Sequence, residues 1–240
     1  MSLFFRYPYL ALSLLLTAQA ALALLLAPRT RRRALLSGFL ATPSSLLSFA
    51  FVPDYWQPAR VATLVVGPED LLFSFSTGVL VWVLAERLAG RELPCWRFSL
   101  DRAGPVILRH LVWSTLFLAV FLLSWAGGAQ PMDATLLAAA VILPFVASRT
   151  RHAWRPALAA GGGFTLLYAV TFLAVLSAWP HLIHQWNHGS LWGWSLLSIP
   201  GEELAWAASF GALWPLTLAY AFDTRPPRPM LSQSQETQRL

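Results

Sequence analysis

The sequence predicts an all-α membrane protein with seven transmembrane helices. Of its 240 residues, 57% are hydrophobic and only 12% are charged, whereas a soluble domain carries about 25% charged residues. Apolar runs recur along almost the whole chain, and a membrane-spanning helix needs about 20 such residues. We expect seven spans, at residues 8–27, 34–52, 69–88, 106–126, 134–148, 156–178 and 201–222.

The boundaries of these spans follow from the residues between them. The first run is followed by "PRTRRR", whereas a cleaved secretory signal carries its positive charge ahead of the run, so we expect this helix to be retained. Clusters of Pro, Gly or Arg separate the later runs. The third run opens with two acids, the fifth is the shortest, and the seventh follows Pro200, a residue type that favours the start of a helix.

Arginine is concentrated on alternate connections, which predicts the orientation. The connections after the first, third and fifth spans, and the tail after the seventh, contain most of the arginines. These are Arg29, Arg31, Arg32, Arg33, Arg87, Arg91, Arg97, Arg102, Arg109, Arg149, Arg151, Arg155, Arg225 and Arg228. The opposite side has only Arg6 and Arg60. Because cytoplasmic loops are enriched in basic residues, we expect a multi-pass protein of the inner (plasma) membrane, with its N-terminus outside and its C-terminus in the cytoplasm.

The net charge of +6 therefore reflects topology and contact with anionic lipid rather than binding of nucleic acid. The chain contains no lysine, which excludes a retinal Schiff base of the rhodopsin type. Its single cysteine, Cys95, excludes an intramolecular disulfide.

Two segments of the chain resemble one another. "GPEDLLFSFSTG" (67–78) and "PGEELAWAASFG" (200–211) each place an acidic pair at the start of an apolar helix, after an aromatic outer loop. The alignment pairs Glu69 with Glu202, Asp70 with Glu203, Phe73 with Trp206, Ser76 with Ser209 and Gly78 with Gly211. We therefore predict two parallel three-helix repeats, at 1–90 and 131–223, joined by a loop and connecting helix (91–130) and followed by a disordered tail (224–240).

The acidic pairs have two interpretations. They could simply cap their helices, since carboxylates in the first turn interact favourably with the helix dipole. Alternatively they are buried, because adjacent helical residues point about 100° apart and cannot both turn away from the bundle. Acids inside membrane proteins mark functional sites by default. A desolvated carboxyl with a second one beside it holds its proton at neutral pH and can protonate a substrate.

Aromatic residues surround these acids in the expected helices. A carbocation is stabilised by π faces, which attract a cation without offering it a nucleophile. The candidate substrate-binding residues are Phe73, Phe75, Trp82, Trp206, Phe210, Trp214, Trp192 and Trp194. The alternative is that they pack against lipid or form an interfacial belt.

The stretch "LWGWSLLSIPGEELAWA" resembles the integral-membrane lycopene cyclase domain family. The hallmark of that family is a Pro-x-Glu-Glu motif that opens a helix after a tryptophan-containing outer loop. Here the corresponding residues are Pro200, Gly201, Glu202 and Glu203, preceded by Trp192 and Trp194. The first copy departs from the pattern, with "GPED" in place of the motif, and "LAWAA" replaces the usual phenylalanine-rich run in the second, so the chain resembles a divergent member.

The resemblance implies a lycopene cyclase-like isomerase, an intramolecular lyase that needs no cofactor. An acid protonates the terminal double bond of a linear carotenoid, the cation closes the ring, and a base removes a ring proton. By residue-by-residue correspondence the catalytic candidates are Glu69, Asp70, Glu202 and Glu203. The implied partners are a hydrophobic isoprenoid or carotenoid substrate and the lipid bilayer, together with a homo- or hetero-oligomeric partner as an open alternative.

Three rival interpretations stay open at the level of sequence. Capture of the cation by water would make the protein a carotenoid hydratase or another isoprenoid-modifying enzyme. A non-catalytic membrane subunit or pigment carrier would not need the acids. His181, His184 and His188 have the spacing of metal ligands on one helical face. An amphipathic interfacial helix, with Trp186 and Trp192 in the bilayer, is the preferred explanation of the histidines, so we expect no metal site.

Overall fold

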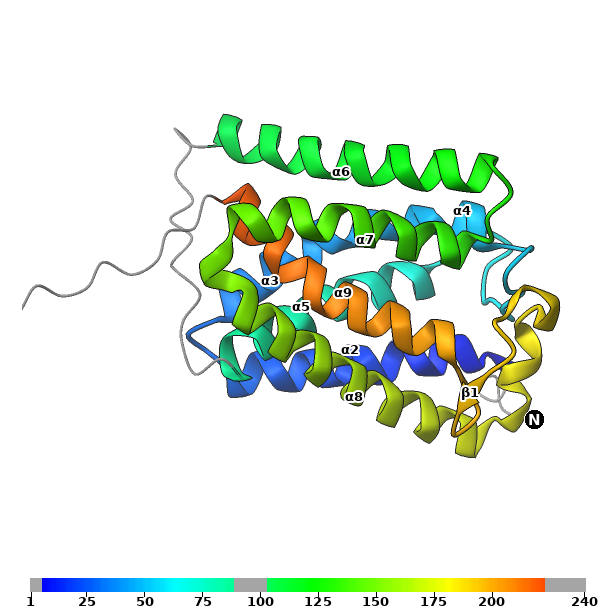
Figure 1. Cartoon of the computed structure of the whole chain (residues 1–240). Coiled ribbons are helices and arrows are strands. Elements are labelled where there is room, and N and C mark those ends of the chain that lie inside the picture. Colours follow the sequence, from blue (N-terminus) through cyan, green and yellow to red (C-terminus); the bar gives the residue numbers. More distant parts are fainter. Residues whose placement is uncertain (1–5, 89–102, 223–240) are drawn as a thin grey trace, which may run out of the picture.

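In the part of the chain that the structure describes, seven long apolar helices run roughly alongside one another and confirm the expected fold class (Figure 1). The computed structural model describes residues 6–88 and 103–222. Its helices are α2 (Pro8–Leu26), α3 (Arg31–Ala41), α4 (Ser48–Phe51), α5 (Pro68–Leu88), α6 (Ala103–Ala126), α7 (Pro131–Arg149), α8 (Trp154–Ala178) and α9 (Gly201–Ala221). The predicted cytoplasmic residues Cys95, Arg91, Arg97, Arg102, Arg225 and Arg228 and the predicted tail 224–240 lie outside the described residues.

The second span is broken into three pieces. Between α3 and α4 the backbone tightens into the 3-10 helix η1 (Thr42–Leu47). Pro43 causes this change, since it lacks an N–H and its ring clashes with the carbonyl four residues earlier. The hydroxyl of Thr42 also donates to the carbonyl of Gly38 at 3.0 Å. Irregular backbone at membrane depth is tolerated where it lines a cavity, and η1 does so.

The third helix of each expected repeat packs against the two before it. Helix α5 lies against α2 and α3, and α9 lies against α7 and α8. Helix α5 approaches α3, and α9 approaches α8, closely at a glycine, and these two glycines correspond to one another in the expected repeat. A Cβ at Gly78 would lie 3.0 Å from Cα of Gly38 in α3, and a Cβ at Gly211 would lie 2.9 Å from Cα of Gly161 in α8. This arrangement is compatible with the duplication, which stays a prediction.

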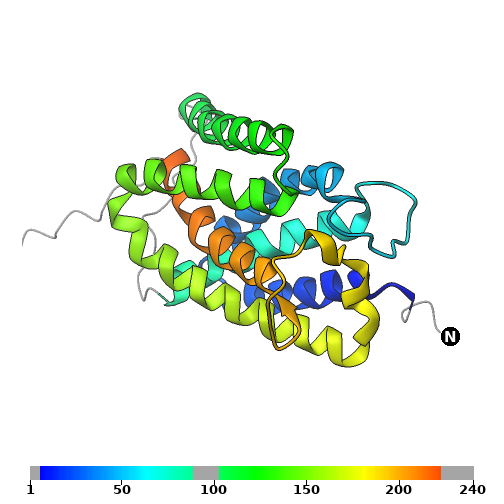
Figure 2. The same cartoon turned by 45° about the vertical axis from the view of Figure 1, so that its right-hand side comes forward.

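Helix α6, the expected connector, lies at the edge of the bundle (Figure 2). It packs against α7 and α9, and within its 24 residues only Trp113 and Phe121 are buried. Most of its leucine and valine side chains are exposed on the surface of the molecule, where they would face lipid. One side of α6 nevertheless faces the interior and forms part of the cavity described below.

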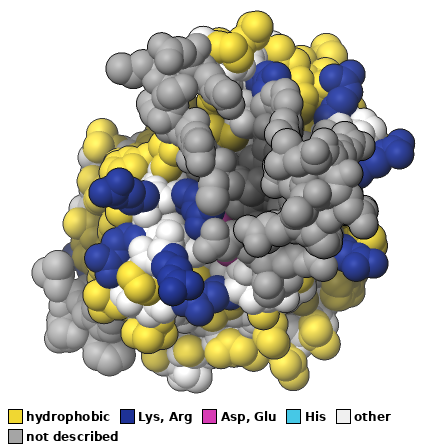
Figure 3. All heavy atoms as spheres, turned by 90° about the vertical axis from the view of Figure 1, so that its left-hand side faces the viewer, with side chains coloured by type: hydrophobic (Ala, Val, Ile, Leu, Met, Phe, Trp, Pro, Cys, Tyr) yellow, Lys and Arg dark blue, Asp and Glu magenta, His cyan; other side chains and the backbone are white. Residues whose placement is uncertain are grey.

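The two ends of the bundle differ in charge. Arginine side chains surround one end, where α3 and α8 begin and α5 and α7 end (Figure 3). The other end carries the connecting loops, which include the 3-10 helices η4 (Pro180–Gln185) and η5 (His188–Ser190) and a hairpin of β1 (Ser195–Leu196) and β2 (Ile199–Pro200). A bridge between Trp56 and Trp186 joins the loops of the two expected repeats. This end also contains the acidic pairs.

Candidate functional site

The four predicted acids are all buried, at the starts of α5 and α9. The exposed fractions are 0% for Glu69, 2% for Asp70, 1% for Glu202 and 7% for Glu203. They are not solvated helix caps, which was the simplest alternative at the level of sequence. Burial of four carboxyl groups in an apolar bundle requires hydrogen bonds for each of them.

Within each pair the first acid is directed toward its own outer loop. Glu69 accepts a hydrogen bond from the backbone N–H of Val61 at 2.7 Å. Glu202 accepts from the backbone N–H of Trp192. Both contacts join a carboxylate to a loop residue that precedes it in the chain, so these two acids anchor the loops that cover the helix ends.

The second acid of the first pair, Asp70, is an ion-paired carboxylate. Its Oδ2 atom accepts from the guanidinium of Arg60 and from the backbone N–H of Gly67, the latter at 2.7 Å. Its Oδ1 atom accepts from the hydroxyls of Tyr9 at 3.0 Å and Ser48 at 2.8 Å. The side chain of Arg60 is only 8% exposed. The contact between this buried guanidinium and the carboxylate is a charge-assisted hydrogen bond.

The second acid of the other pair, Glu203, has neutral partners instead. The hydroxyl of Tyr168 lies 2.7 Å from its Oε2 atom. The indole N–H of Trp186 and the hydroxyl of Tyr55 donate to its Oε1 atom, at 3.0 Å and 3.3 Å. Among the residues that the structure describes, no basic side chain forms an ion pair with Glu203. The second acids of the two pairs therefore differ. Asp70 is ion-paired, whereas Glu203 is uncompensated, because no positive charge in the described part of the chain is paired with it.

Tyr55 lies in the loop after α4 and keeps its proton in this position. Burial raises the pKa of its phenol well above its usual range, and the nearby carboxyl groups of Glu203 and Glu202 raise it further. Tyr55 therefore stays a hydrogen-bond donor to Glu203 over the whole physiological pH range.

Aromatic rings connect the two acids. The ring of Tyr9, whose hydroxyl contacts Asp70, lies 6.1 Å from that of Phe73. Phe73 in turn lies 6.3 Å from the ring of Tyr168, whose hydroxyl contacts Glu203. These distances are centroid separations in the range at which aromatic pairs interact favourably. Asp70 and Glu203 are thus parts of one site.

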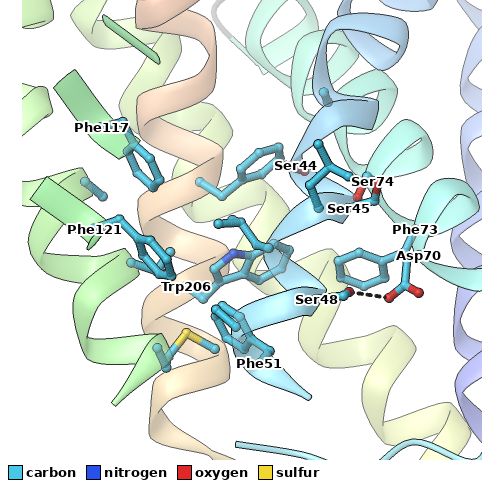
Figure 4. Close-up of a pocket in the computed structure, with 18 of the residues that line it drawn as sticks. Ser44, Ser45, Ser48, Phe51, Asp70, Phe73, Ser74, Phe117, Phe121 and Trp206 are labelled. Carbon is cyan, nitrogen blue, oxygen red and sulfur yellow. Dashed lines mark hydrogen bonds between the residues drawn. The ribbon is translucent and has the colours of Figure 1, made fainter. Parts of the chain in front are cut away.

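A cavity of about 550 Å³ opens beside these rings, and Asp70 lines it (Figure 4). Glu203 lines the same cavity. Ligand pockets typically have volumes of about 300–1,000 Å³. Trp206, Phe210 and Trp214 form one wall, with successive ring centroids 5.5 Å and 5.6 Å apart and ring planes within 15° of parallel. Their spacing of four residues places them on one face of α9, so the wall is a stacked aromatic stripe.

Half of the predicted aromatic residues line this cavity, namely Phe73, Trp206, Phe210 and Trp214. The other four lie elsewhere. Phe75 packs against Phe39, with ring centroids 5.2 Å apart. Trp82 is fully buried away from the cavity. Trp192 and Trp194 are 44% and 53% exposed on the outer loop, where the backbone of Trp192 contacts Glu202.

The sequence interpretation missed the residues that hold the acids, namely Tyr9, Ser48, Tyr55, Arg60, Tyr168 and Trp186. Two signals could have found several of them. Tyrosines in apolar spans need a partner for the hydroxyl when they are buried, and Tyr9 and Tyr168 are such residues. Arg60 is an exception to the predicted distribution of arginine, and its partner is Asp70.

The segment that contains the three histidines does not form the expected interfacial α-helix. It folds into the two 3-10 helices η4 and η5, and Trp186, expected in the bilayer surface, is turned inward with only 5% exposure. The rings of His184 and His188 lie 6.2 Å apart. Within residues 6–88 and 103–222, no group of three or more His, Cys, Asp or Glu side chains is placed to hold a metal ion.

Comparison with known proteins finds a match for the C-terminal part of the chain. Residues 130–221 match the model of a family described as lycopene cyclase. This part of the chain is similar to the lycopene cyclase family. The matched segment contains α7, α8 and α9, and with them Tyr168, Glu203 and the aromatic stripe. No curated protein and no solved structure matches the chain. The match supports a carotenoid cyclase-like enzyme in the membrane.

Proposed function

We propose that the protein cyclises one end of a linear, lycopene-like carotenoid within the membrane by acid–base chemistry. The observation that carries this proposal is the pairing of an uncompensated carboxyl, Glu203, with an ion-paired carboxylate, Asp70, at one aromatic cavity. Acid and base assignments follow from environments that favour different protonation states in two nearby groups. The cavity walls are suited to an apolar polyene.

Glu203 is the proposed proton donor. Trp186 and Tyr55 occupy its Oε1 atom, which leaves Oε2, beside Tyr168, as the oxygen that carries the transferable proton. A tyrosine hydroxyl can either donate or accept a hydrogen bond. Tyr168 can therefore satisfy Oε2 both before and after the proton leaves, without rearrangement of the site.

The proposed reaction is an isomerisation and involves no oxidant or reductant. The proton of Glu203 adds to the terminal carbon–carbon double bond and leaves a carbocation. The electron pair of a neighbouring double bond then forms the new ring bond. Loss of a ring proton restores a double bond, so the product has the same atoms as the substrate. The enzyme is reset when Glu203 regains a proton and the base loses one.

Asp70 is the proposed counter-charge and base. Arg60 forms an ion pair with it on the loop side, while its carboxylate still lines the cavity. Negative charge placed in advance where positive charge develops stabilises a transition state. The rings of Phe73 and Trp206, whose centroids lie 5.4 Å apart, add cation–π attraction without a nucleophile.

The proposal also includes the orientation in the membrane. The arginine-rich end would lie in the cytoplasm of the plasma (inner) membrane, and the acids near the opposite surface, with the N-terminus outside. The proton cycle would then take place close to the outer face of the bilayer.

The proposed function is tested by expression in a bacterium that accumulates lycopene, followed by analysis of the pigments. We expect cyclic end groups from the wild-type protein and at least about a hundredfold fewer from Glu203→Gln. In heavy water each ring should gain one solvent-derived deuteron, because the first step is protonation. A hydroxylated acyclic end would instead indicate a hydratase. Unchanged lycopene in membranes that contain the folded protein would contradict a catalytic role on this substrate.

A further inference from the structure

The cavity is open at the side of the bundle, between α6 and the broken second span. Four leucine and phenylalanine residues line the cavity and are also exposed on the surface of the molecule. They are Leu46 (59% exposed) and Phe49 (62%) from η1 and α4, and Leu118 (48%) and Leu122 (45%) from α6. We define these four residues as the lateral rim. Because all of them are apolar and lie along membrane-spanning helices, the opening faces hydrocarbon rather than water.

The broken second span accounts for the opening on one side. The cavity wall here is formed by η1 and the start of α4, and Figure 4 shows that Ser44, Ser45 and Ser48 lie along this stretch. Serine side chains are small, and the 3-10 backbone does not continue the α-helical surface of α3. Mid-helix 3-10 segments often occur at functional positions.

The opening is closed toward the outer loops. Phe121 of α6 is only 2% exposed and packs against Ala50 of α4 and Ala134 and Ala138 of α7. Above the acids, the bridge of Trp56 with Trp186 joins the two loops, and Tyr55 beside it is only 1% exposed. A ligand that reaches Asp70 and Glu203 therefore has an apolar route from the bilayer and a covered site on the water side.

We propose that the substrate enters laterally from the lipid through this rim, and that the far end of the polyene, which does not react, stays outside it. This inference rests on the proposed cyclase function. The part of α9 that lines the cavity runs from Glu203 to Thr217, or about 21 Å at the helical rise. That is shorter than the roughly 30 Å hydrocarbon core, so the cavity does not enclose the whole of a polyene of membrane length.

Substrate selection follows from this geometry. The residues of the cavity contact only the end that is cyclised, so the enzyme distinguishes substrates by that end. We expect similar turnover of linear carotenoids whose far end is open, already cyclised or bulky and polar. A closed cavity that had to enclose the whole molecule would reject the bulky far ends.

A rim variant with a matched control tests the route. Leu118→Trp narrows the opening, whereas Leu116→Trp adds the same ring to α6 at a position that is 37% exposed and does not line the cavity. We expect Leu118→Trp to reduce the rate of ring formation at least tenfold in membranes, and Leu116→Trp to leave it within twofold of the wild type. Equal rates for the two variants would overturn the lateral route.

A labelling experiment provides a readout that does not depend on turnover. Cysteines are introduced as Leu118→Cys or Leu116→Cys in a Cys95→Ser background, so that each variant has a single thiol. Each thiol is labelled with a nitroxide, the full-length protein is placed in lipid vesicles, and the collision of the label with oxygen dissolved in the bilayer is measured. Lycopene should reduce the collision rate at 118 and not at 116.

The two experiments separate the failure of the route from the failure of the function. Protection at 118 without ring formation would contradict the cyclase and keep the lateral opening as a polyene-binding site. Ring formation that is insensitive to Leu118→Trp, with no protection at 118, would contradict the lateral route and keep the cyclase. Rejection of carotenoids with a bulky far end would contradict the proposed position of the unreacted end.

Discussion

Glu202 and Glu203 are neighbours in the chain, yet their carboxyl groups belong to different parts of the protein. Glu202 accepts from the backbone N–H of Trp192 and anchors the outer loop. Glu203 contacts Tyr168, Trp186 and Tyr55 and lines the cavity. The roughly 100° turn between adjacent helical residues produces this division. One acid of the pair therefore maintains the structure over the site, while its neighbour is available for chemistry.

Substitution of each acid by glutamine separates these roles. Glu203→Gln keeps the shape and removes the transferable proton, so we expect ring formation to fall by about 10²- to 10⁴-fold, the usual contribution of a general acid. Glu202→Gln keeps an oxygen that can accept from Trp192, so its rate should fall by less than about tenfold, corresponding to ~1 kcal/mol for one weakened hydrogen bond. Pigment analysis at equal amounts of membrane protein measures both. Equal losses would contradict the division.

Tyr168→Phe tests the partner of the transferable proton. It leaves Oε2 of Glu203 without its 2.7 Å contact, and a buried polar group that loses its partner costs about 1–3 kcal/mol. We expect the rate to fall about 10- to 100-fold while the protein remains folded. Tyr220→Phe is the matched control, because this tyrosine packs against Phe145 near the other end of α9. Unchanged activity of Tyr168→Phe would remove Tyr168 from the mechanism.

The Arg60–Asp70 pair predicts different effects on stability and activity. Arg60→Gln leaves a buried carboxylate without its cation, and breaking a buried pair in this way costs about 3–5 kcal/mol. Adding Asp70→Asn removes the stranded charge, so the double variant should regain much of the thermal stability measured in detergent. It should not regain ring formation, because the counter-charge is lost. Recovery of activity in the double variant would show that Asp70 acts only in folding.

Tyr55 predicts a loss of stability at high pH. Its pKa is raised in the folded protein, mainly by burial, whereas the phenol of an unfolded chain titrates near pH 10. Above about pH 10 the unfolded state therefore binds fewer protons at this residue than the folded state does, and the free energy of unfolding falls as pH rises. The melting temperature should drop more between pH 9 and pH 11 in the wild type than in Tyr55→Phe. An equal drop in the two would contradict the contribution of Tyr55.

Much of the fold could be predicted from the sequence because span length and arginine placement are local properties. The break in the second span is also local, since Pro43 and the serines around it are visible in the sequence, but its consequence is not. That η1 lines a cavity depends on α6, a helix more than fifty residues later, and no periodicity within either segment specifies how they face one another.

The site was only partly predictable for the same reason. The acids and the stripe of α9 could be found because they lie together in the sequence at helical spacing. The partners of those acids come from distant segments, such as Tyr9 for Asp70 and Tyr168 for Glu203. The directions of the Glu69 and Glu202 carboxyl groups depend on loop backbone atoms of Val61 and Trp192. A single sequence contains no signal for those contacts.

The close crossings at Gly78 and Gly211 support the final prediction, which concerns the helices that position the acids. A Cβ at Gly211 would lie 2.9 Å from Cα of Gly161 and 3.0 Å from the carbonyl oxygen of Ala160. These are backbone atoms, so α8 and α9 would have to move apart. Gly211→Ala should therefore cost about 1–3 kcal/mol, the usual cost of overpacking.

Gly162→Ala is the matched control for this substitution. It lies on α8 next to Gly161, and a Cβ there would meet no atom within 4 Å. Alanine is favoured over glycine in a helix by about 1 kcal/mol, so this variant should be as stable as the wild type or more so. Thermal unfolding in detergent compares the two. Because Glu203 precedes Gly211 on α9, Gly211→Ala should also slow ring formation, whereas equal stability of both variants would contradict the close crossing.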